Sequence, residues 1–377
     1  MFRIFRKSKT SKARRGVITI KSGRLRTPLF MPDATRGYVK TLENRELKAV
    51  GISAMVVNTY HLFLEPGTKI IKKAGGIHGF MGWSNPLLSD SGGYQVFSLV
   101  HKNPQMGRIT DEGVIFRSPL DGSLQKITPE KSIQIQFDLG VDMMVCFDDP
   151  PPNGAPRAKI EEAVERTIVW AKRCRREYDR QIKKRKIKEK ERPLLFGVIQ
   201  GGEYIDLRKY CIEELVKIGF DGYGFGARHV NEKGEFLEEV LKKTAEFIPE
   251  SSLRFALGVG TPEDIKRCVE MGWDMFDCVI PTREARHGRA YIYKTQNTKS
   301  KLFPSYKVIN ITNSKFKKDF GSLEEGCECL ACRNYTRAYL YHLFKMKDPL
   351  GQRFLSIHNL WFYSNWIKRI KLKFSGL

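Results

Sequence analysis

Residues 128–148, TPEKSIQIQFDLGVDMMVCFD, have the order helix, glycine, strand, acid that decides the fold. Thr128 and Pro129 are typical of a helix N-cap and of the first helical position. Gly140 suits the left-handed position just past a helix end. The apolar run that follows is typical of a strand buried on both faces, and it ends at Asp148. The stretch therefore predicts a helix packed on a strand of a parallel sheet.

The same unit recurs along the chain. Helix-like segments end at Gly51, Gly219 and Gly272, and short apolar runs follow each glycine. The helix before Gly272 opens with Thr261-Pro262-Glu263, as the helix before Gly140 opens with a threonine, a proline and a glutamate. Helices that alternate with apolar strands imply a parallel sheet covered on both faces.

Polar or small residues recur where these strands end. They are Asn58, Asp148, Gln200, Gly226, Ala227, Gly258 and Asp277. In a (β/α)8 barrel the carboxyl ends of the strands share one face, and that face holds the active site. A doubly wound sheet would show the same local pattern, but no G-x-G-x-x-G motif follows a strand to indicate a dinucleotide. We therefore predict an α/β fold, a (β/α)8 TIM barrel.

The charge balance points to a polyanionic partner. Among 377 residues, 66 Lys and Arg outweigh 42 Asp and Glu, for a formal net charge of +24. Such an excess favours nucleic acid over an anionic membrane surface, because no amphipathic anchor is evident. No apolar run is long enough to span a bilayer, and the basic start MFRIFRKSKTSKARRG lacks the apolar stretch of a signal peptide. A soluble, cytoplasmic protein without a membrane partner is expected.

Two basic segments have more than one interpretation. Residues 171–193 predict an extended helix that either presents a solvated surface or contacts phosphates. The closing segment WFYSNWIKRIKLKF, residues 361–374, mixes aromatic and basic side chains. It is compatible with a docked terminal helix, a subunit contact or a nucleic-acid surface.

Three of the eight cysteines, Cys327, Cys329 and Cys332, lie within six residues. Such a knuckle suits tetrahedral zinc with thiolate ligands. The alternative is three reduced thiols in a surface turn. Zinc is favoured over it, because so polar a stretch is not expected to be buried and adjacent free thiols would be open to oxidation. His342 and His358 are the downstream candidates for a fourth ligand of a closed, structural site. The other five cysteines are scattered, as expected for reduced thiols.

Three acids stand out at predicted strand ends or beside glycines: Asp90, Asp148 and Asp277. Each taken alone is compatible with a cap, a turn or an ion pair. Two carboxylates that flank one centre can instead cleave a glycosidic bond, one attacking the anomeric carbon and the other handling protons. Basic side chains next to Asp277 could hold a phosphate backbone beside that chemistry. They are Arg283, Arg286 and Arg289.

Several long motifs give the chain a specific resemblance. In order they are TPLFMPDAT, NTYHL, LSDSGGYQVFSL, SPLDGS, LFGVIQGG and FDCVIPTR, followed by the cysteine cluster. The chain resembles the bacterial-type tRNA-guanine transglycosylases, also called queuine tRNA-ribosyltransferases, from about residue 15 to residue 360. The resemblance implies a (β/α)8 barrel with an inserted zinc-binding subdomain in the C-terminal region. It also implies exchange of the wobble guanine of tRNAs with a G-U-N anticodon for a 7-deazaguanine base, without ATP.

The resemblance assigns roles to individual residues. Asp277 resembles the nucleophile that forms a covalent tRNA intermediate, and Asp90 resembles the general acid/base. A further set resembles the residues that bind the base, by stacking on it, by recognising its purine edge or by offering backbone N–H groups. They are Tyr94, Asp148, Gln200, Gly226, Ala227, Leu257 and Gly258. Cys327, Cys329, Cys332 and His358 match the zinc ligands, so the resemblance prefers His358 over His342. The family also implies a homodimer.

This sequence departs from the family pattern beside the base. Bacterial members usually have a glycine pair where this chain has Gly226-Ala227, and a Leu followed by a small residue where it has Arg228-His229. Pro150 stands where a cysteine is common. Val230 matches the bacterial pattern, which favours 7-aminomethyl-7-deazaguanine (preQ1 base) over queuine. A catalytically silent tRNA-binding subunit and a hydrolytic glycosidase are the competing interpretations. The expected division places the barrel at 1–300, the zinc-binding subdomain at 301–360 and a basic aromatic segment that completes the fold at 361–377.

Overall fold

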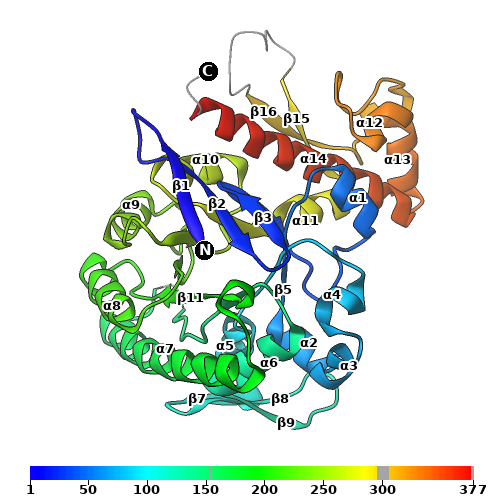
Figure 1. Cartoon of the computed structure of the whole chain (residues 1–377). Coiled ribbons are helices and arrows are strands. Elements are labelled where there is room, and N and C mark those ends of the chain that lie inside the picture. The colour runs from blue at the N-terminus through cyan, green and yellow to red at the C-terminus, as the bar shows by residue number, and fades with distance from the viewer. Residues whose placement is uncertain (153, 295–304, 375–377) are drawn as a thin grey trace.

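The structure, a computed structural model, describes residues 1–152, 154–294 and 305–374. Within them, eight parallel strands form a barrel surrounded by helices (Figure 1). The strands follow one another in chain order: β4 (Leu29–Pro32), β5 (Met55–Val57), β6 (Leu87–Ser89), β10 (Met143–Val145), β11 (Leu194–Ile199), β12 (Gly222–Phe225), β13 (Leu253–Ala256) and β14 (Met275–Cys278). A parallel bridge from Asp33 to Val56, with the Ala34 N–H donating to the Val56 carbonyl at 2.7 Å, closes the ring. The predicted (β/α)8 barrel is confirmed.

Helices follow each barrel strand and cover the outside of the ring. They are α1 (Asn44–Ala49), α2 (Thr59–Leu64), α3 (Thr68–Lys73), α4 (Gly76–Met81), α5 (Gly93–Lys102), α6 (Pro129–Leu139), α7 (Arg157–Arg185), α8 (Ile205–Ile218), α9 (Glu238–Phe247), α10 (Pro262–Glu270), α11 (Ile280–Arg286) and α14 (Pro349–Lys373). Short 3-10 turns lie at Pro104–Met106, Glu189–Glu191 and Ser314–Lys318. Among the described residues, no helix is long and apolar enough to cross a membrane.

An N-terminal antiparallel sheet closes the amino end of the barrel. Its strands are β1 (Phe2–Lys7), β2 (Arg14–Ile20) and β3 (Gly23–Arg26). Ile18, Ile20 and Leu25 from this sheet are buried in the same apolar cluster as the inward side chains of the barrel. The buried guanidinium of Arg14 pairs with Asp274 at 2.6 Å, just before β14 begins. The end of the barrel opposite the carboxyl ends of its strands is therefore sealed by apolar packing and one buried ion pair.

The inward face of β12 carries glycines because its neighbours need the space. A Cβ on Gly222 would lie 2.5 Å from the Phe196 ring and 2.8 Å from Leu253 Cβ. A Cβ on Gly224 would lie 2.4 Å from Leu257 Cδ1. Interiors are close-packed, so even one methyl group at these positions requires a neighbour to move.

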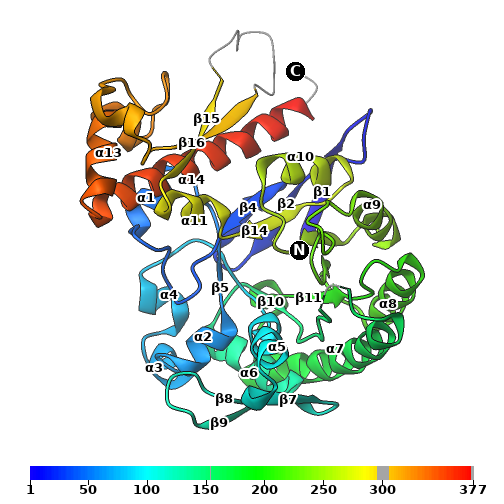
Figure 2. The ribbon, with the colours of Figure 1, turned by 180° about the vertical axis from the view of Figure 1, so that it is seen from behind.

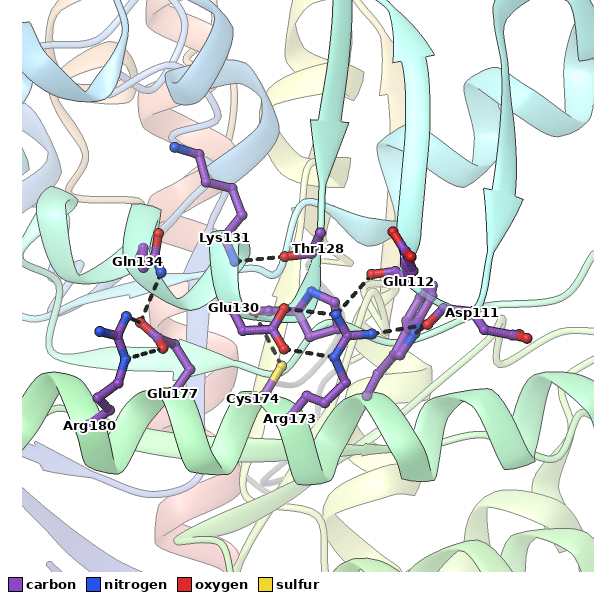
Figure 3. Close-up of polar contacts among 12 residues, drawn as sticks. Asp111, Glu112, Thr128, Glu130, Lys131, Gln134, Arg173, Cys174, Glu177 and Arg180 are labelled. Carbon is purple, nitrogen blue, oxygen red and sulfur yellow. Dashed lines mark hydrogen bonds and ion pairs between the residues drawn. The ribbon is translucent and has the colours of Figure 1, made fainter.

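The long helix α7 is held against α6 and the turn between β7 (Gly107–Thr110) and β8 (Gly113–Arg117) (Figure 3). With β9 (Leu124–Ile127), these strands form a separate antiparallel sheet. Arg173 forms two hydrogen bonds with Glu130, at 2.7 and 2.8 Å, and also donates to the carbonyls of Asp111 and Glu112 at 3.0 Å. Four other arginines of the basic run at 171–193 also pair with carboxylates, so part of its charge is neutralised within the protein; they are Arg175, Arg180, Arg185 and Arg192.

The chain leaves the barrel after α11 and returns as α14. The excursion contains β15 (Arg289–Tyr293), β16 (Tyr306–Asn310), α12 (Leu330–Asn334) and α13 (Arg337–Lys345). Helix α14 lies across α11 in both views (Figures 1 and 2). Its Tyr363 hydroxyl donates to the Gly260 carbonyl at 2.8 Å, and its Trp366 indole donates to the Pro262 carbonyl at 2.7 Å. The aromatic residues of the C-terminal segment therefore pack as part of a docked helix.

Of the two expected domain boundaries, one lies outside the described residues and the other falls within a helix. The boundary between residues 300 and 301 lies outside the described residues, as do residues 375–377. The boundary between residues 360 and 361 falls inside α14, which is one continuous helix.

We predict that Gly222→Ala destabilises the barrel by about 1–3 kcal/mol, because the new methyl group overpacks against Phe196 and Leu253. Urea unfolding followed by circular dichroism measures the change. Gly321→Ala is the matched control, since its methyl group would meet the Asp319 side chain at 3.2 Å and no barrel residue. Equal unfolding midpoints for the two variants would contradict the packing argument.

Candidate active site

The alternation of side chains along the strands brings a set of polar groups to one end of the barrel. At the end of the barrel where the strands finish, which we call the barrel mouth, six residues each lie two positions after an apolar residue of the barrel interior. Since the side-chain period of a strand is two, these residues continue the inward-facing rows at the carboxyl end. They are Asp33, Asn58, Asp90, Gln200, Leu257 and Asp277. The barrel mouth is thus ringed by carboxyl and amide groups above an apolar interior.

Asp90 lies at the end of β6 in a cage of donors. The Asn58 amide donates to its Oδ2 at 2.5 Å, and the backbone N–H groups of Thr59 and Gly92 donate to its Oδ1 at 2.9 and 3.1 Å. Burial, together with the negative charge of Asp277, raises the pKa of Asp90 to about 7, against the opposing effect of these hydrogen bonds. A carboxyl with this pKa can both give and take a proton near neutral pH.

Asp277 lies on β14 and has fewer partners. The backbone N–H of Gly258, at the end of β13, donates to its Oδ1 at 2.9 Å. Burial raises the pKa of Asp277 to about 6, and this hydrogen bond opposes the rise. At neutral pH the carboxyl is therefore mostly ionised, as a nucleophile requires.

Asp148 and Gln200 form a buried pair between β10 and β11. The Gln200 amide donates to Asp148 Oδ2 at 2.7 Å, and the Ser91 hydroxyl donates to Oδ1 at 3.3 Å. Burial raises the pKa of Asp148 to about 7. The Gln200 Oε1 atom is buried and has no hydrogen-bond partner among the described residues. An unpartnered buried acceptor beside a carboxyl suits a ligand that presents several N–H groups.

The backbone after β12 is fixed from below by a buried arginine. Arg208 donates to the carbonyls of Gly202, Ile199 and Gly226, at 2.7, 3.3 and 3.2 Å. A Cβ on Gly226 would lie 2.5 Å from Gln200 Nε2, so glycine is needed for that amide to fit. The next residue, Ala227, has a φ of 67°.

Residues near the rim are more open. Tyr94, the second residue of α5, is 56% exposed, so its ring is free for a stacking contact. Leu257 is partly buried and Gly258 is exposed. Arg283 and Arg286 lie on α11, where Arg286 lines a pocket with Asp33. Arg289 begins β15 and pairs with Glu284.

The structure also assigns positions to groups that the motifs did not single out for chemistry. Asn58 and Thr59 bind the Asp90 carboxyl, and Arg208 supports the loops under Gln200 and Gly226. Asp33 stands at the barrel mouth beside Asp90 and Asp277. The alternation Leu29, Met31, Asp33 was a visible signal for Asp33, whereas nothing in the sequence around Arg208 indicates its tertiary partners.

A second polar cluster lies where α14 meets the excursion. Cys327, Cys329, Cys332 and His358 are all buried, with their candidate ligand atoms within 4.8 Å of one another. The expectation that so polar a stretch would stay exposed is wrong, because α12 and α14 cover it. The structure brings His358, not His342, to the three sulfurs.

The geometry of this cluster fits a tetrahedral metal ion. His358 Nδ1 is 3.6, 3.6 and 3.4 Å from the three sulfurs. A tetrahedral ion with zinc bond lengths would separate nitrogen from sulfur by about 3.5 Å. His358 Nε2 donates to the Tyr291 carbonyl at 2.7 Å, which leaves Nδ1 as the free ligand atom. The cluster can therefore hold a metal ion in a closed, structural site.

Taken together, the fold and the barrel mouth define a (β/α)8 enzyme with paired carboxyl groups next to a buried site for a hydrogen-bonding ligand. Residues 8–375 match the family model described as Queuine tRNA-ribosyltransferase. A queuine tRNA-ribosyltransferase of Halothermothrix orenii is 42% identical over 370 residues, covering 98% of this chain and 92% of the relative. One from Francisella tularensis subsp. novicida is 44% identical over 364 residues, covering 96% and 92%.

The chain belongs to the queuine tRNA-ribosyltransferase family. Members of this family are pentosyltransferases that act on tRNA and a base, by transglycosylation of guanine. The resemblance carried by the sequence motifs is confirmed. The family also accounts for the excess of basic residues, because tRNA is a polyanion.

We predict that His358→Ala lowers the metal content of the purified protein to well below half of one equivalent, since the cluster loses a ligand. Atomic absorption or inductively coupled plasma mass spectrometry measures the metal. His342→Ala is the matched control, because His342 is an exposed residue of α13 outside the cluster. A full equivalent of metal in His358→Ala would remove His358 from the ligand set.

Proposed function

We propose that the protein exchanges the wobble guanine of tRNAs with a G-U-N anticodon for preQ1 base through a covalent intermediate on Asp277. The observation that carries this proposal is the pairing of Asp90 and Asp277 at one barrel mouth, with the pKa of each carboxyl raised toward neutrality. A nucleophile that is mostly ionised and an acid that is half protonated are the two groups that glycosidic exchange needs.

The exchange proceeds in two displacements. The Asp277 carboxylate attacks the ribose anomeric carbon, the bond from that carbon to guanine breaks, and the proton of Asp90 goes to the leaving base. The ionised Asp90 then removes a proton from the incoming base, whose ring nitrogen attacks the same carbon and releases the Asp277 carboxylate. One glycosidic bond replaces another, so no ATP is needed.

The base is held on the side of the barrel formed by β10 to β13. Asp148 and the unpartnered Gln200 Oε1 support recognition of the purine edge, and Gly226 and Ala227 offer backbone N–H groups. Tyr94 and Leu257 stack on the base, with Gly258 beside them. A pocket of about 350 Å³ beside Ala227 and Arg228 gives room for a 7-substituent.

The remaining proposals concern the metal and the partners. The metal is one structural Zn²⁺, held by Cys327, Cys329, Cys332 and His358. It would stabilise a zinc-binding subdomain at residues 301–360 against the barrel at residues 1–300. Residues 361–377 complete the fold. The protein acts as a cytoplasmic homodimer. The phosphates of the tRNA contact Arg283, Arg286 and Arg289 near the nucleophile, supported by the net charge of +24.

Two other functions are less well supported. A catalytically silent tRNA-binding subunit would not need two interacting carboxyl groups with raised pKa. A hydrolytic glycosidase could use the same pair with water as the acceptor, but the buried Asp148–Gln200 pair provides donors and acceptors for a purine.

The test of the proposed function is exchange of labelled guanine into tRNA with a G-U-N anticodon, followed by a chase with preQ1 base or with queuine. Incorporation and chase by preQ1 base are expected. Tight tRNA binding without incorporation would favour the silent subunit. Release of guanine without incorporation would favour the hydrolase, and queuine as the better chase would overturn the choice of base.

We predict that Asp277→Ala abolishes the covalent tRNA adduct and lowers exchange at least 1,000-fold, because the nucleophile is missing. Denaturing gel electrophoresis of the protein with labelled tRNA detects the adduct, and filter binding is expected to show tRNA affinity within about three-fold of wild type. Asp121→Ala, a change of an exposed carboxylate in the turn between β8 and β9, is the control. An adduct that persists in Asp277→Ala would place the nucleophile elsewhere.

We predict a bell-shaped pH profile for kcat/KM of tRNA. Activity falls below about pH 6 as Asp277 is protonated, and falls above about pH 7 as Asp90 loses the proton that the leaving guanine needs. Asn58→Ala removes a hydrogen bond that favours the ionised form of Asp90, so the alkaline limb is expected to move to higher pH. The acid limb stays in place.

Initial rates of guanine exchange between pH 5 and 9 measure both limbs. Asn365→Ala is the control, because its amide donates to the Trp361 carbonyl on the outer helix α14. A shift of the alkaline limb to lower pH in Asn58→Ala would contradict the assignment of Asp90 as the acid.

A further inference from the structure

Asp33 is a third carboxyl group at the barrel mouth, beyond the pair that the proposed mechanism uses. It follows β4 directly, and its inward-facing predecessors Leu29 and Met31 belong to the buried barrel interior. It forms the parallel bridge to Val56 that closes the barrel. Its side chain therefore continues the inward row of β4 at the face where Asp90 and Asp277 lie.

The register of the strands places Asp33 diagonally above the proposed nucleophile. Strands β14 and β4 lie side by side (Figure 2). They pair so that Asp277 lies opposite Met31, and Asp33 is two residues farther along. Two residues advance a strand by roughly 7 Å, and neighbouring strands are about 4.8 Å apart. The two carboxyl groups are thus diagonal neighbours on adjacent strands, separated by a span that a ribose ring can bridge.

Asp33 differs from the other carboxyl groups in its lack of partners. Asp90 accepts from three donors and Asp277 accepts from Gly258, but among the described residues nothing donates a hydrogen bond to the Asp33 carboxyl or pairs with it. Burial and the negative charges of Asp277 and Asp90 hold the pKa of Asp33 well above its usual range. A partly buried carboxyl group without a partner in the free protein is available for a ligand.

The order of the strands around the ring separates base from sugar. Apart from Tyr94 on α5, the proposed base-binding groups follow β10 to β13, and Asp277 lies on the next strand, β14. The next strand around the ring is β4, so a nucleotide whose base lies over β10 to β13 extends its ribose toward β4. A pocket of about 310 Å³ on this side is lined by Asp33 together with Arg36, Lys40 and Arg286. Those cations suit the phosphates on either side of that ribose.

Stereochemistry indicates which atom of the ribose meets Asp33. In a nucleotide within a chain, the 3′ and 5′ oxygens are esterified, so the 2′-hydroxyl is the free hydroxyl. The base lies on the β face, so Asp277 attacks from the α face, which also carries the 2′-hydroxyl. Hydrogen bonds to the hydroxyl next to the anomeric carbon strengthen in the transition states of glycosidic cleavage.

We propose that the Asp33 carboxyl accepts a hydrogen bond from the 2′-hydroxyl of the ribose under exchange and so positions the anomeric carbon over Asp277. This inference rests on the proposed function, because it takes a ribonucleotide of tRNA as the substrate. Asp33 would then add selectivity for ribose over 2′-deoxyribose to the site. A protonated carboxyl still has a carbonyl oxygen to accept the bond, so its neutrality is compatible with the role.

The test compares two tRNAs that differ only in the sugar at the wobble guanosine, ribose or 2′-deoxyribose, as substrates for labelled-guanine exchange by the full-length enzyme. Asp33→Leu removes the acceptor at similar volume, and Asp33→Asn keeps a carbonyl oxygen. We expect Asp33→Leu to lower kcat/KM about ten-fold with the ribose substrate and less than about two-fold with the deoxyribose substrate. Asp33→Asn is expected to stay within about three-fold of wild type with both.

Several outcomes would overturn the inference. They are an equal loss on the two substrates in Asp33→Leu, no loss on either, or an Asp33→Asn variant as impaired as Asp33→Leu. If Asp33→Leu fails to fold, judged by its thermal midpoint and metal content, Asp33→Ala takes its place with the same expectations. Asp121→Asn is the matched carboxylate control and is expected to leave both substrates unchanged.

Wild-type exchange on the ribose substrate, measured in the same assay, separates this inference from the proposed function. A wild type that exchanges guanine while Asp33→Leu treats both sugars alike leaves the proposed function intact and overturns the role of Asp33. A wild type without exchange overturns both.

Discussion

Desolvation of carboxyl groups is the constraint on which the barrel mouth depends. The interior below is filled with aliphatic and aromatic side chains, so the acids that end the inward rows have little water around them. Burial is the first cause of the raised pKa of Asp90, Asp148 and Asp277. Hydrogen bonds oppose the rise in each case, while the negative charge of Asp277 adds to the rise at Asp90 and that of Asp149 adds to the rise at Asp148. The same apolar packing that stabilises the fold thus brings these acids to pKa values where proton transfer is efficient.

Helix α14 connects the metal cluster to the catalytic barrel. His358 faces the cysteines, while the neighbouring Asn359 accepts from the Tyr291 N–H and donates to the carbonyls of Pro281 and Arg289. Pro281 belongs to α11, the helix that follows the strand of Asp277. A metal ion in the cluster would therefore fix α14, which in turn holds α11 at the end of β14. The ion itself would lie outside the barrel mouth and would have no open coordination position for chemistry.

Sequence patterns predicted the features that depend on local chemistry. The threonine caps at Thr128 and Thr261 form as expected, accepting from the N–H groups of Lys131 and Asp264, because capping is decided within one turn. The barrel and its strand ends followed from the recurring helix–glycine–strand unit. The roles assigned to Asp90 and Asp277 remain predictions, although the structure places both residues at the same mouth.

Features that depend on tertiary contacts were not accessible in the same way. The spacing of the cysteines left His342 and His358 equivalent. The preference for His358 came from the resemblance, and the docking of α14 is what brings His358 to the three sulfurs. The basic run along α7 gave no sign that Arg173 would bind Glu130, since the two residues are 43 positions apart. Arg208 is fully buried under the site, and the sequence could not predict this. Its partners are backbone carbonyl groups, which do not depend on the identity of the side chains.

The backbone at Ala227 shows how these constraints combine. An alanine with a φ of 67° costs about 1–3 kcal/mol and persists only where its surroundings determine it. Here Arg208 holds the preceding Gly226 carbonyl at 3.2 Å, and its guanidinium carbon lies 3.9 Å from the centre of the Phe225 ring. The strained peptide is thus anchored from below by groups with no access to the ligand. Preorganised N–H groups need no reorganisation when a ligand binds. An anchored, left-handed Ala227 therefore serves the proposed recognition of the base carbonyl oxygen where a flexible glycine pair would have to be ordered on binding.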